Sequence, residues 1–350
     1  MSPRQSSIKT QLTSFSEPES TLAAKKARVT KRLDRLLFCA EGAFQCVLRQ
    51  GGPVYLAAAS SLIASVVFVY FAAVFPQVLA SNSRLVTAGH LVSGLFCLLN
   101  IIFNYVQCVI TDPGSTEILD TSGYQMVAMQ CQRRCRRCRK PKPPLAHHCH
   151  ICSRCVLRMD HHCPWMNNCI GFHNYRFFVL FTFYLWAGSA YSAWMLLWEL
   201  GRIGRMSQFH MGEAVYPYAL LVPFVLSAAV SIALTALMGW HFFLIWQGQS
   251  TIDMLNFWRD SKEAKAQGTT LIHPYNLGLK RNFQEVFDVS GHRLWWIRWM
   301  LPSRAKRRGD GIFFPTMYDS LQVRPQDLDL TPRTRQHISE VLSQSDTSAV

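Results

Sequence analysis

The sequence predicts an all-α membrane protein in which four transmembrane helices carry a cysteine-rich domain between the second and third helices. Three observations lead to this fold class. Of the 350 residues, 49% are hydrophobic and only 16% are charged, yet the formal net charge is +15. Apolar and basic residues must therefore be segregated along the chain, as in a polytopic membrane protein. In addition, seven of the 12 cysteines fall within residues 135–169.

Four apolar segments have the length of a transmembrane helix: residues 54–75, 85–110, 177–198 and 216–246. A bilayer hydrocarbon core of about 30 Å requires about 20 helical residues. The first and fourth segments contain no Asp, Glu, Lys or Arg. The second contains His90 and several side-chain amides, which should face other helices and not lipid. The third has aromatic residues at both ends, as interfacial belts do.

The distribution of Lys and Arg predicts the orientation of these spans. Residues 1–53, 111–176 and 247–350 together carry 33 of the 36 Lys and Arg residues. By the positive-inside rule, both chain termini and the cysteine-rich domain face the cytosol. A cytosolic domain lies in a reducing compartment, which disfavours disulfides. Within the N-terminal region, residues 22–49 have the pattern of a basic amphipathic helix on the membrane, although a solvated helix leading into the first span fits equally well.

The cysteines have the spacing of metal ligands. Cys-x2-Cys pairs begin at Cys135, Cys149 and Cys152, and histidines lie between them. This spacing brings thiolates and imidazoles around a tetrahedral zinc ion. Enough ligands are present for two sites.

One thiol remains once two such sites are filled. Two sites, each made of three cysteines and one histidine, would use six of the seven cysteines. We set Cys163 apart because it follows Asp160-His161-His162 and has no Cys-x2-Cys partner. The remainder is Cys163, one of the neighbours His161 and His162, and Asp160. A cysteine attacks as the thiolate and has an ordinary pKa of about 8.5, so an imidazole oriented by a carboxylate would activate it at neutral pH. The pattern therefore predicts an activated cysteine nucleophile.

The segment Asp160-His161-His162-Cys163, followed by Pro164-Trp165 and Asn168-Cys169-Ile170-Gly171, resembles the DHHC family of protein S-acyltransferases, or palmitoyltransferases. The match runs from Cys135 to Phe178. The resemblance implies that Cys163 is the acyl-accepting nucleophile, that His161 is its base and that Asp160 orients His161. It also implies two structural zinc ions, the first bound by Cys135, Cys138, His148 and Cys155 and the second bound by Cys149, Cys152, His162 and Cys169.

The resemblance further implies a two-step transfer of a palmitoyl or other long-chain acyl group from acyl-CoA to cysteines of cytosolic or membrane proteins. Cys163 would carry the acyl group between the steps, so the enzyme would itself be a lipoprotein with bound palmitate. Candidate contacts for CoA are Trp165, Lys142 and Arg176. Lys142 would replace an arginine that the family usually has where this chain has Leu145. The small residues at 187–189 predict an acyl cavity open to long chains.

The C-terminal region adds weaker motifs. Ser250-Thr251-Ile252-Asp253 is similar to the family's Thr-Thr-x-Glu motif, with a shorter carboxylate at its end. Residues 273–278 and Asn282-Phe283 resemble the segment that packs beneath the catalytic loop. The tail is most similar to the endoplasmic-reticulum subgroup, which favours that membrane, with the Golgi membrane as the alternative. The tryptophans at 295–299, next to the basic residues 304–308, indicate an interfacial anchor against anionic membrane lipid.

Other functions compete with catalysis. A catalytically silent, zinc-stabilised membrane scaffold would not require Cys163. A nucleic-acid-binding zinc module is disfavoured because the segment lacks a recognition-helix pattern, so no nucleic-acid partner is expected. A transporter or channel is disfavoured because the spans lack paired charges. The C-terminal Val350, preceded by Thr347-Ser348-Ala349, could bind a PDZ-type domain, although so short a pattern often occurs by chance.

Overall fold

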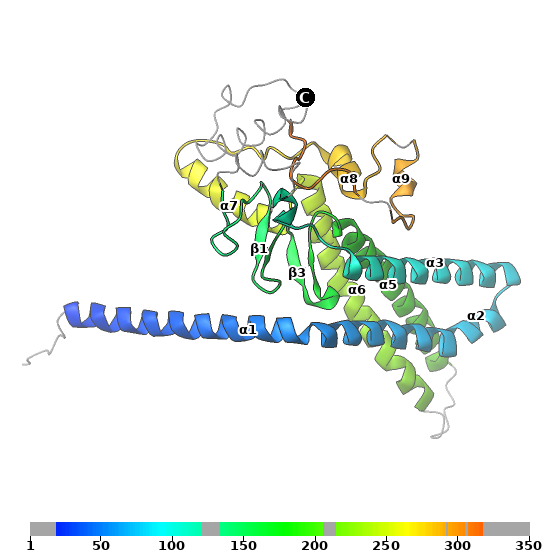
Figure 1. Ribbon diagram of the computed structural model, residues 1–350. Coiled ribbons are helices and arrows are strands. Elements are labelled where there is room, and N and C mark those ends of the chain that lie inside the picture. Colours follow the sequence, from blue (N-terminus) through cyan, green and yellow to red (C-terminus); the bar gives the residue numbers. More distant parts are fainter. Residues whose placement is uncertain (1–18, 121–132, 206–214, 292, 305–306, 318–350) are drawn as a thin grey trace, which may run out of the picture. The chain divides into compact units, whose positions relative to one another are not determined.

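Four long helices dominate the part of the chain that the computed structural model describes, namely residues 19–120, 133–205, 215–291, 293–304 and 307–317 (Figure 1). The chain separates into two units, residues 1–50 and residues 51–350. The predicted catalytic and metal-binding residues all lie in the second unit.

Three helical segments among the described residues are long and apolar enough to cross a membrane: Arg49–Ala80, Arg84–Ile110 and Tyr218–Gln247. They correspond to the first, second and fourth predicted spans. The predicted third span lies in α5 (Tyr175–Arg205), a helix of 31 residues. Its tryptophans, tyrosines, serines and glycines lower its hydropathy, and it is not among the three. The fold is therefore mostly helical, with membrane helices on both sides of the cysteine-rich region, and the count of four spans is not confirmed.

α1 (Glu19–Val69) runs without interruption from the predicted amphipathic segment into the first span. It is followed by a π-helical turn at Tyr70–Val74 and by α2 (Phe75–Ser81), which has Pro76 in its first turn. Proline lacks an N–H and its ring clashes with the carbonyl four residues earlier. The wider π turn accommodates that proline without ending the helix.

α3 (Arg84–Ile110) and α6 (Val215–Gln247) both pack against α5 (Figure 1). Several polar groups of α3 donate hydrogen bonds inside the protein, as inward-facing residues of a membrane helix should. The side-chain amides of Asn100 and Asn104 are buried and donate to carbonyls four residues earlier, at 2.9 and 2.8 Å. His90 Nδ1 lies 2.6 Å from Tyr191 Oη of α5. The contact between His90 and Tyr191 joins α3 to α5, and the two amide bonds lie within α3 itself.

Two short β-hairpins form the centre of the cysteine-rich region. β1 (His147–Cys149) pairs antiparallel with β2 (Arg154–Val156), and β3 (His161–Cys163) pairs antiparallel with β4 (Asn168–Ile170). Single 3₁₀ turns lie at Thr116–Asp120 and Pro164–Met166. The all-α prediction is incomplete here, because strands of three residues are too short to show the alternation by which strands are predicted.

Two asparagines hold the second hairpin to the helices. Asn168 Nδ2 donates to three carbonyl oxygens at the C-terminal end of α3, at 3.0 to 3.2 Å. The last carbonyls of a helix have no partner within it, so Asn168 satisfies groups that would otherwise be unpaired. Asn174, just before α5, donates to Cys169 O at 2.8 Å and accepts from the N–H of Gly171 at 2.9 Å. β4 is therefore fixed against both α3 and α5.

Three shorter helices follow α6: α7 (Thr251–Ala266), α8 (Leu279–Phe287) and α9 (Trp295–Arg298). Asn282 of α8 donates to Trp246 O of α6 at 2.7 Å and to Asn276 Oδ1 at 2.9 Å. The N–H of Leu277 donates to Asn282 Oδ1 at 2.9 Å. Asn282 thus ties the predicted C-terminal motif to the end of α6.

Candidate active site and metal centres

β3 carries two of the three predicted catalytic residues. Because side chains alternate along a strand, His161 and Cys163 lie on one face of β3 and His162 lies on the other. The hairpin register places His161 opposite Ile170, and the N–H of Asp160 donates to Ile170 O at 2.8 Å. The strand therefore separates the predicted reactive pair from the predicted metal ligand.

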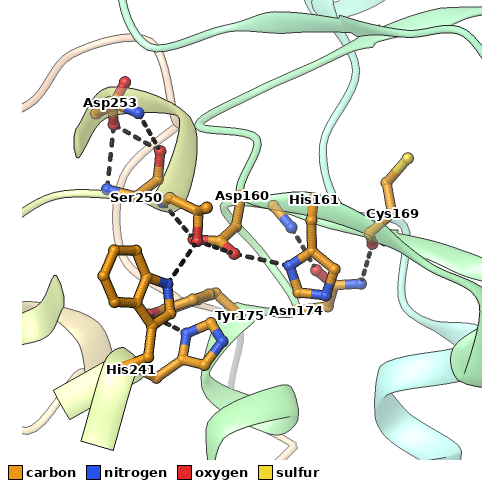
Figure 2. A network of polar contacts seen from close by, with 11 residues as sticks. Asp160, His161, Cys169, Asn174, Tyr175, His241, Ser250 and Asp253 are labelled. Carbon is orange, nitrogen blue, oxygen red and sulfur yellow. Dashed lines mark hydrogen bonds and ion pairs between the residues drawn. The ribbon is translucent and has the colours of Figure 1, made fainter. Parts of the chain in front are cut away.

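Asp160 is 2% exposed, and its Oδ2 lies 2.7 Å from His161 Nδ1 (Figure 2). Thr251, at the start of α7, donates its backbone N–H to Asp160 Oδ1 at 2.8 Å and its hydroxyl to Asp160 Oδ2 at 3.0 Å. Burial alone would raise the pKa of Asp160, but the bonds from His161 and Thr251 outweigh burial and hold that pKa below its ordinary value. The carboxylate stays ionised and occupies Nδ1 of His161.

The His161 ring is also within hydrogen-bonding reach of the Cys163 thiol. Burial opposes the charged imidazolium, but the bonds to Asp160 and Cys163 outweigh it and raise the pKa of His161 to about 9. A base of that strength can accept the proton of the Cys163 thiol. The candidate nucleophile Cys163, the candidate base His161 and the candidate orienting carboxylate Asp160 thus lie in the order that nucleophilic catalysis requires.

Cys163 and His161 line a cavity of about 780 Å³ that extends between α1, α3, α5 and α6. Its other walls are almost entirely apolar side chains of these helices. The small residues at 187–189 line it, as the sequence predicted, and the hydroxyls of Tyr70 and Tyr191 lie 2.9 Å apart in its wall. An apolar cavity that reaches the Cys163 thiol fits a long hydrocarbon chain attached to an acyl group.

Two clusters of cysteine and histidine side chains could each hold a metal ion. They are Cys135, Cys138, His148 and Cys155 in the first cluster and Cys149, Cys152, His162 and Cys169 in the second. Within each cluster, the four ligand atoms lie within 4.8 Å of one another. The structure thus brings together the two ligand sets that the resemblance implied, each set separately.

Local geometry explains how one short loop serves both clusters. His148 and Cys149 are neighbours in β1, so strand alternation directs one to each cluster. The Cys-x2-Cys turns are closed by N–H···S bonds, from Cys138 to Cys135 at 3.4 Å and from Cys152 to Cys149 at 3.3 Å. Each turn directs its two cysteine sulfur atoms toward the centre of its own cluster.

The three candidate CoA contacts occupy different surroundings. Trp165 is 52% exposed, lines the cavity and packs edge-on against Tyr55 with ring centroids 5.7 Å apart. Lys142 is half-buried, and burial together with the nearby Arg133 lowers its pKa. Arg176 is buried; its guanidinium lies 4.7 Å from the Phe177 ring and donates to a carbonyl of the C-terminal segment. The predicted PDZ-binding end at Val350 lies outside the described residues.

The Ser250–Asp253 motif combines two roles. Ser250 caps α7 in a capping box with Asp253, whose carboxylate accepts from the Ser250 hydroxyl at 2.7 Å. Burial raises the pKa of Asp253 to about 6, and its Oδ1 lies 3.9 Å from His147 Nε2. The sequence resemblance singled out this motif, but it did not indicate that Thr251 is the residue that contacts Asp160.

His241 of α6 is a site residue that sequence reasoning missed. It is buried, its Nδ1 lies 3.0 Å from Tyr175 Oη, and its ring centroid is 6.2 Å from that of His161 (Figure 2). The Phe178 ring lies 5.0 Å from both histidine rings. A single histidine within an apolar span has no motif spacing. The one available signal was that ionisable residues in spans face the protein interior.

Comparison with known proteins agrees with this geometry. The profile of the family described as DHHC palmitoyltransferase matches residues 129–257. The chain is similar to probable protein S-acyltransferase 15 of Arabidopsis thaliana, at 31% identity over 265 residues that cover 72% of this chain and 99% of the relative. It is also similar to palmitoyltransferase ZDHHC16 of Mus musculus, at 32% identity over 276 residues, which cover 76% of this chain and 74% of the relative. Palmitoyltransferase ZDHHC16A of Danio rerio is 28% identical over 326 residues, with 80% and 83% covered.

Proposed function

The chain belongs to the DHHC palmitoyltransferase family, and on that premise we propose that it moves a long-chain acyl group from acyl-CoA to protein cysteines through Cys163. Protein S-acyltransferase activity follows from the family; the roles of individual residues are our proposal. The observation that carries it is the buried Asp160–His161 pair beside a thiol that lines the apolar cavity.

In the first step, His161 holds the proton of Cys163 and the thiolate attacks the thioester carbonyl carbon of acyl-CoA. The bond from that carbon to the CoA sulfur breaks, and the CoA thiolate leaves with the proton from His161. In the second step, a substrate cysteine gives its proton to His161 and attacks the acyl-enzyme, which releases Cys163. Each step exchanges one thioester for another, so no further energy source is needed.

The cavity would hold the acyl chain during both steps. Phe178 lies near His161, and Tyr191 lies 13 residues further along α5, which corresponds to about 20 Å of helix. A saturated chain advances about 1.3 Å per carbon, from C–C bonds of about 1.5 Å in a zigzag. A palmitoyl chain, about 19 Å long by this measure, would thus end near the Tyr70–Tyr191 pair. This match favours long-chain acyl-CoA as the donor.

Zinc is the metal that suits both clusters. Zn–S bonds of about 2.3 Å and Zn–N bonds of about 2.0 Å in a tetrahedron place ligand atoms about 3.5–3.8 Å apart. The S···S distances are 3.7 Å between Cys138 and Cys155 and 3.4 Å between Cys152 and Cys169. With four protein ligands each, the ions have no open position for substrate. Bound zinc would stabilise the hairpins, and β3 would position His161 and Cys163.

The proposed topology has four spans, with α5 as the third. α5 packs between α3 and α6, both of which are candidate membrane helices. The excess of Lys and Arg supports a cytosolic location of both termini and of the cysteine-rich domain. We propose the endoplasmic reticulum as the membrane, with the Golgi as the alternative, because the C-terminal tail resembles the endoplasmic-reticulum subgroup.

Acyl transfer onto the purified protein tests the nucleophile. The protein is incubated with labelled palmitoyl-CoA and then treated with neutral hydroxylamine, which cleaves thioesters. Wild type should carry label that hydroxylamine releases, and Cys163→Ser should carry none. Cys97→Ser is the matched control, because Cys97 also lines the cavity but has no histidine–aspartate pair beside it. Equal labelling of wild type and Cys163→Ser, with metal content unchanged, would contradict the assignment and favour a silent scaffold.

A further inference from the structure

The segment that follows α8 presents apolar side chains outward. We define the Trp segment as residues 293–304, which include α9. Leu294, Trp296, Ile297 and Leu301 are exposed, and Trp296 is 56% accessible. A single exposed apolar residue is common on a protein surface. Four exposed apolar residues within eight positions, called here the exposed patch, indicate a surface that contacts something other than water.

The opposite face of the Trp segment is packed against the protein. The Trp299 ring lies 5.4 Å from Phe183 of α5 and 5.4 Å from Phe283 of α8, centroid to centroid. Tyr184 Oη of α5 donates to Met300 O at 2.5 Å. The segment is therefore held in place on α5, and its exposed patch has a fixed direction.

These contacts set the depth of the Trp segment. Phe183 is eight residues after Tyr175, the first residue of α5, which corresponds to about 12 Å along the helix. Amphipathic segments lie about 5–10 Å into the boundary between headgroups and acyl chains. If α5 crosses the bilayer as proposed above, the exposed patch lies at that boundary and faces lipid.

The positive charges of the Trp segment determine which kind of lipid it can bind. The exposed residues Arg293, Arg298 and Arg304 flank the apolar patch within the Trp segment. Guanidinium groups bind phosphate and carboxylate oxygens in bidentate fashion. We infer that the Trp segment is an anionic-phospholipid site, with its tryptophan and leucine side chains in the cytosolic leaflet and its arginines on the headgroups. The inference rests on the proposed membrane topology and not on the transfer chemistry.

The site is connected to the catalytic centre through α8. The Trp299 ring lies 5.1 Å from that of Phe287, which is buried in the same core cluster as Cys163 and Phe178. Phe178 in turn packs against His161 with ring centroids 5.0 Å apart. Lipid that holds the Trp segment against α5 therefore supports the packing beneath His161. Acyl transfer should be faster in a bilayer that contains anionic lipid.

The test uses the full-length protein in nanodiscs of phosphatidylcholine with or without phosphatidylserine, plus a trace of photoactivatable phosphatidylserine. Lipid adducts are mapped to peptides by mass spectrometry. In the wild type, adducts should concentrate in the Trp segment. The triple variant Arg293→Gln, Arg298→Gln, Arg304→Gln should lose them. Each basic residue near an anionic surface contributes about fivefold in binding, so the loss should exceed about tenfold.

The control is Arg259→Gln, Lys262→Gln, Lys265→Gln, which removes the same charge from exposed positions of α7. It should keep the adducts and the stimulation by phosphatidylserine. The triple variant of the Trp segment should lose both and keep the transfer rate measured in phosphatidylcholine alone. Equal loss in both variants, or wild-type adducts spread evenly over the protein, would overturn the inference. Failure of Cys163 to accept an acyl group in phosphatidylcholine alone would contradict the proposed function and leave the adduct result readable.

Discussion

Thr251→Val isolates the link between α7 and the catalytic carboxylate. The Thr251 hydroxyl donates to Asp160 Oδ2 at 3.0 Å and accepts from Trp240 Nε1 at 3.3 Å, while its backbone N–H bonds to Asp160 Oδ1 at 2.8 Å. Valine keeps the shape and the backbone bond but removes the hydroxyl. A hydrogen bond to a charged group contributes about 1.5–3 kcal/mol. If that free energy orients His161 in the transition state, autoacylation should slow by about ten- to a hundredfold.

The rate of Cys163 acylation is measured from labelled palmitoyl-CoA at several pH values, and bound metal is counted by mass spectrometry. Thr251→Ser is the matched control, because serine keeps the hydroxyl and should retain most of the rate. The Thr251 hydroxyl also donates to the ionised Asp160 carboxylate, so its removal should raise the pKa of Asp160. A valine variant with wild-type rate and metal content would refute the role assigned to Thr251.

Three other substitutions test separate parts of the molecule. Burial raises the pKa of Asp253 from about 3.9 in the unfolded chain to about 6 in the folded protein, so the folded state loses stability as pH rises through that window. Asp253→Asn should therefore raise the melting temperature of the protein more at pH about 8 than at pH about 5. Equal changes in melting temperature at the two pH values would contradict this expectation. Gly188→Leu should fill the cavity and shift autoacylation toward shorter acyl-CoA, whereas Gly239→Leu, outside the cavity lining, should leave chain preference unchanged. His241→Phe removes the partner of the Tyr175 hydroxyl and should slow autoacylation severalfold, with partial recovery in His241→Gln; an unchanged rate in the phenylalanine variant would exclude this role.

Sequence reasoning predicted the parts of the site that depend on local spacing. The Cys-x2-Cys turns and the run from Asp160 to Cys163 are contiguous, so the sequence contains both the residue types and their separation. The first, second and fourth spans could also be predicted from the sequence, because their length and apolar composition identify them as candidate membrane helices. α5 is different because its Trp, Tyr, Ser and Gly residues lower its hydropathy while it packs between two apolar helices. Its place in the fold comes from tertiary contacts that hydropathy does not measure.

Contacts between distant segments could not be predicted in the same way. Thr251 lies 91 residues after Asp160, and Tyr175 lies 66 residues before His241, so neither pair has a local pattern. The family motif drew attention to residues 250–253, but it did not indicate which of them contacts Asp160. The structure instead uses Asp253 to cap α7 and so aims the N–H and hydroxyl of Thr251 at Asp160.

The alternation of β3 accounts for the joint presence of zinc-type ligands and a reactive cysteine. His161 and Cys163 share one face of a three-residue strand, and His162 projects from the other face into the second ligand cluster. Any shift of His162 toward or away from its cluster therefore rotates the nucleophile and its base together. Asn168, opposite Cys163 in the hairpin, holds β4 to the end of α3. His161 and Cys163 thus lie between a cluster that could hold a metal ion and the end of α3, a candidate membrane helix, and both residues line the apolar cavity.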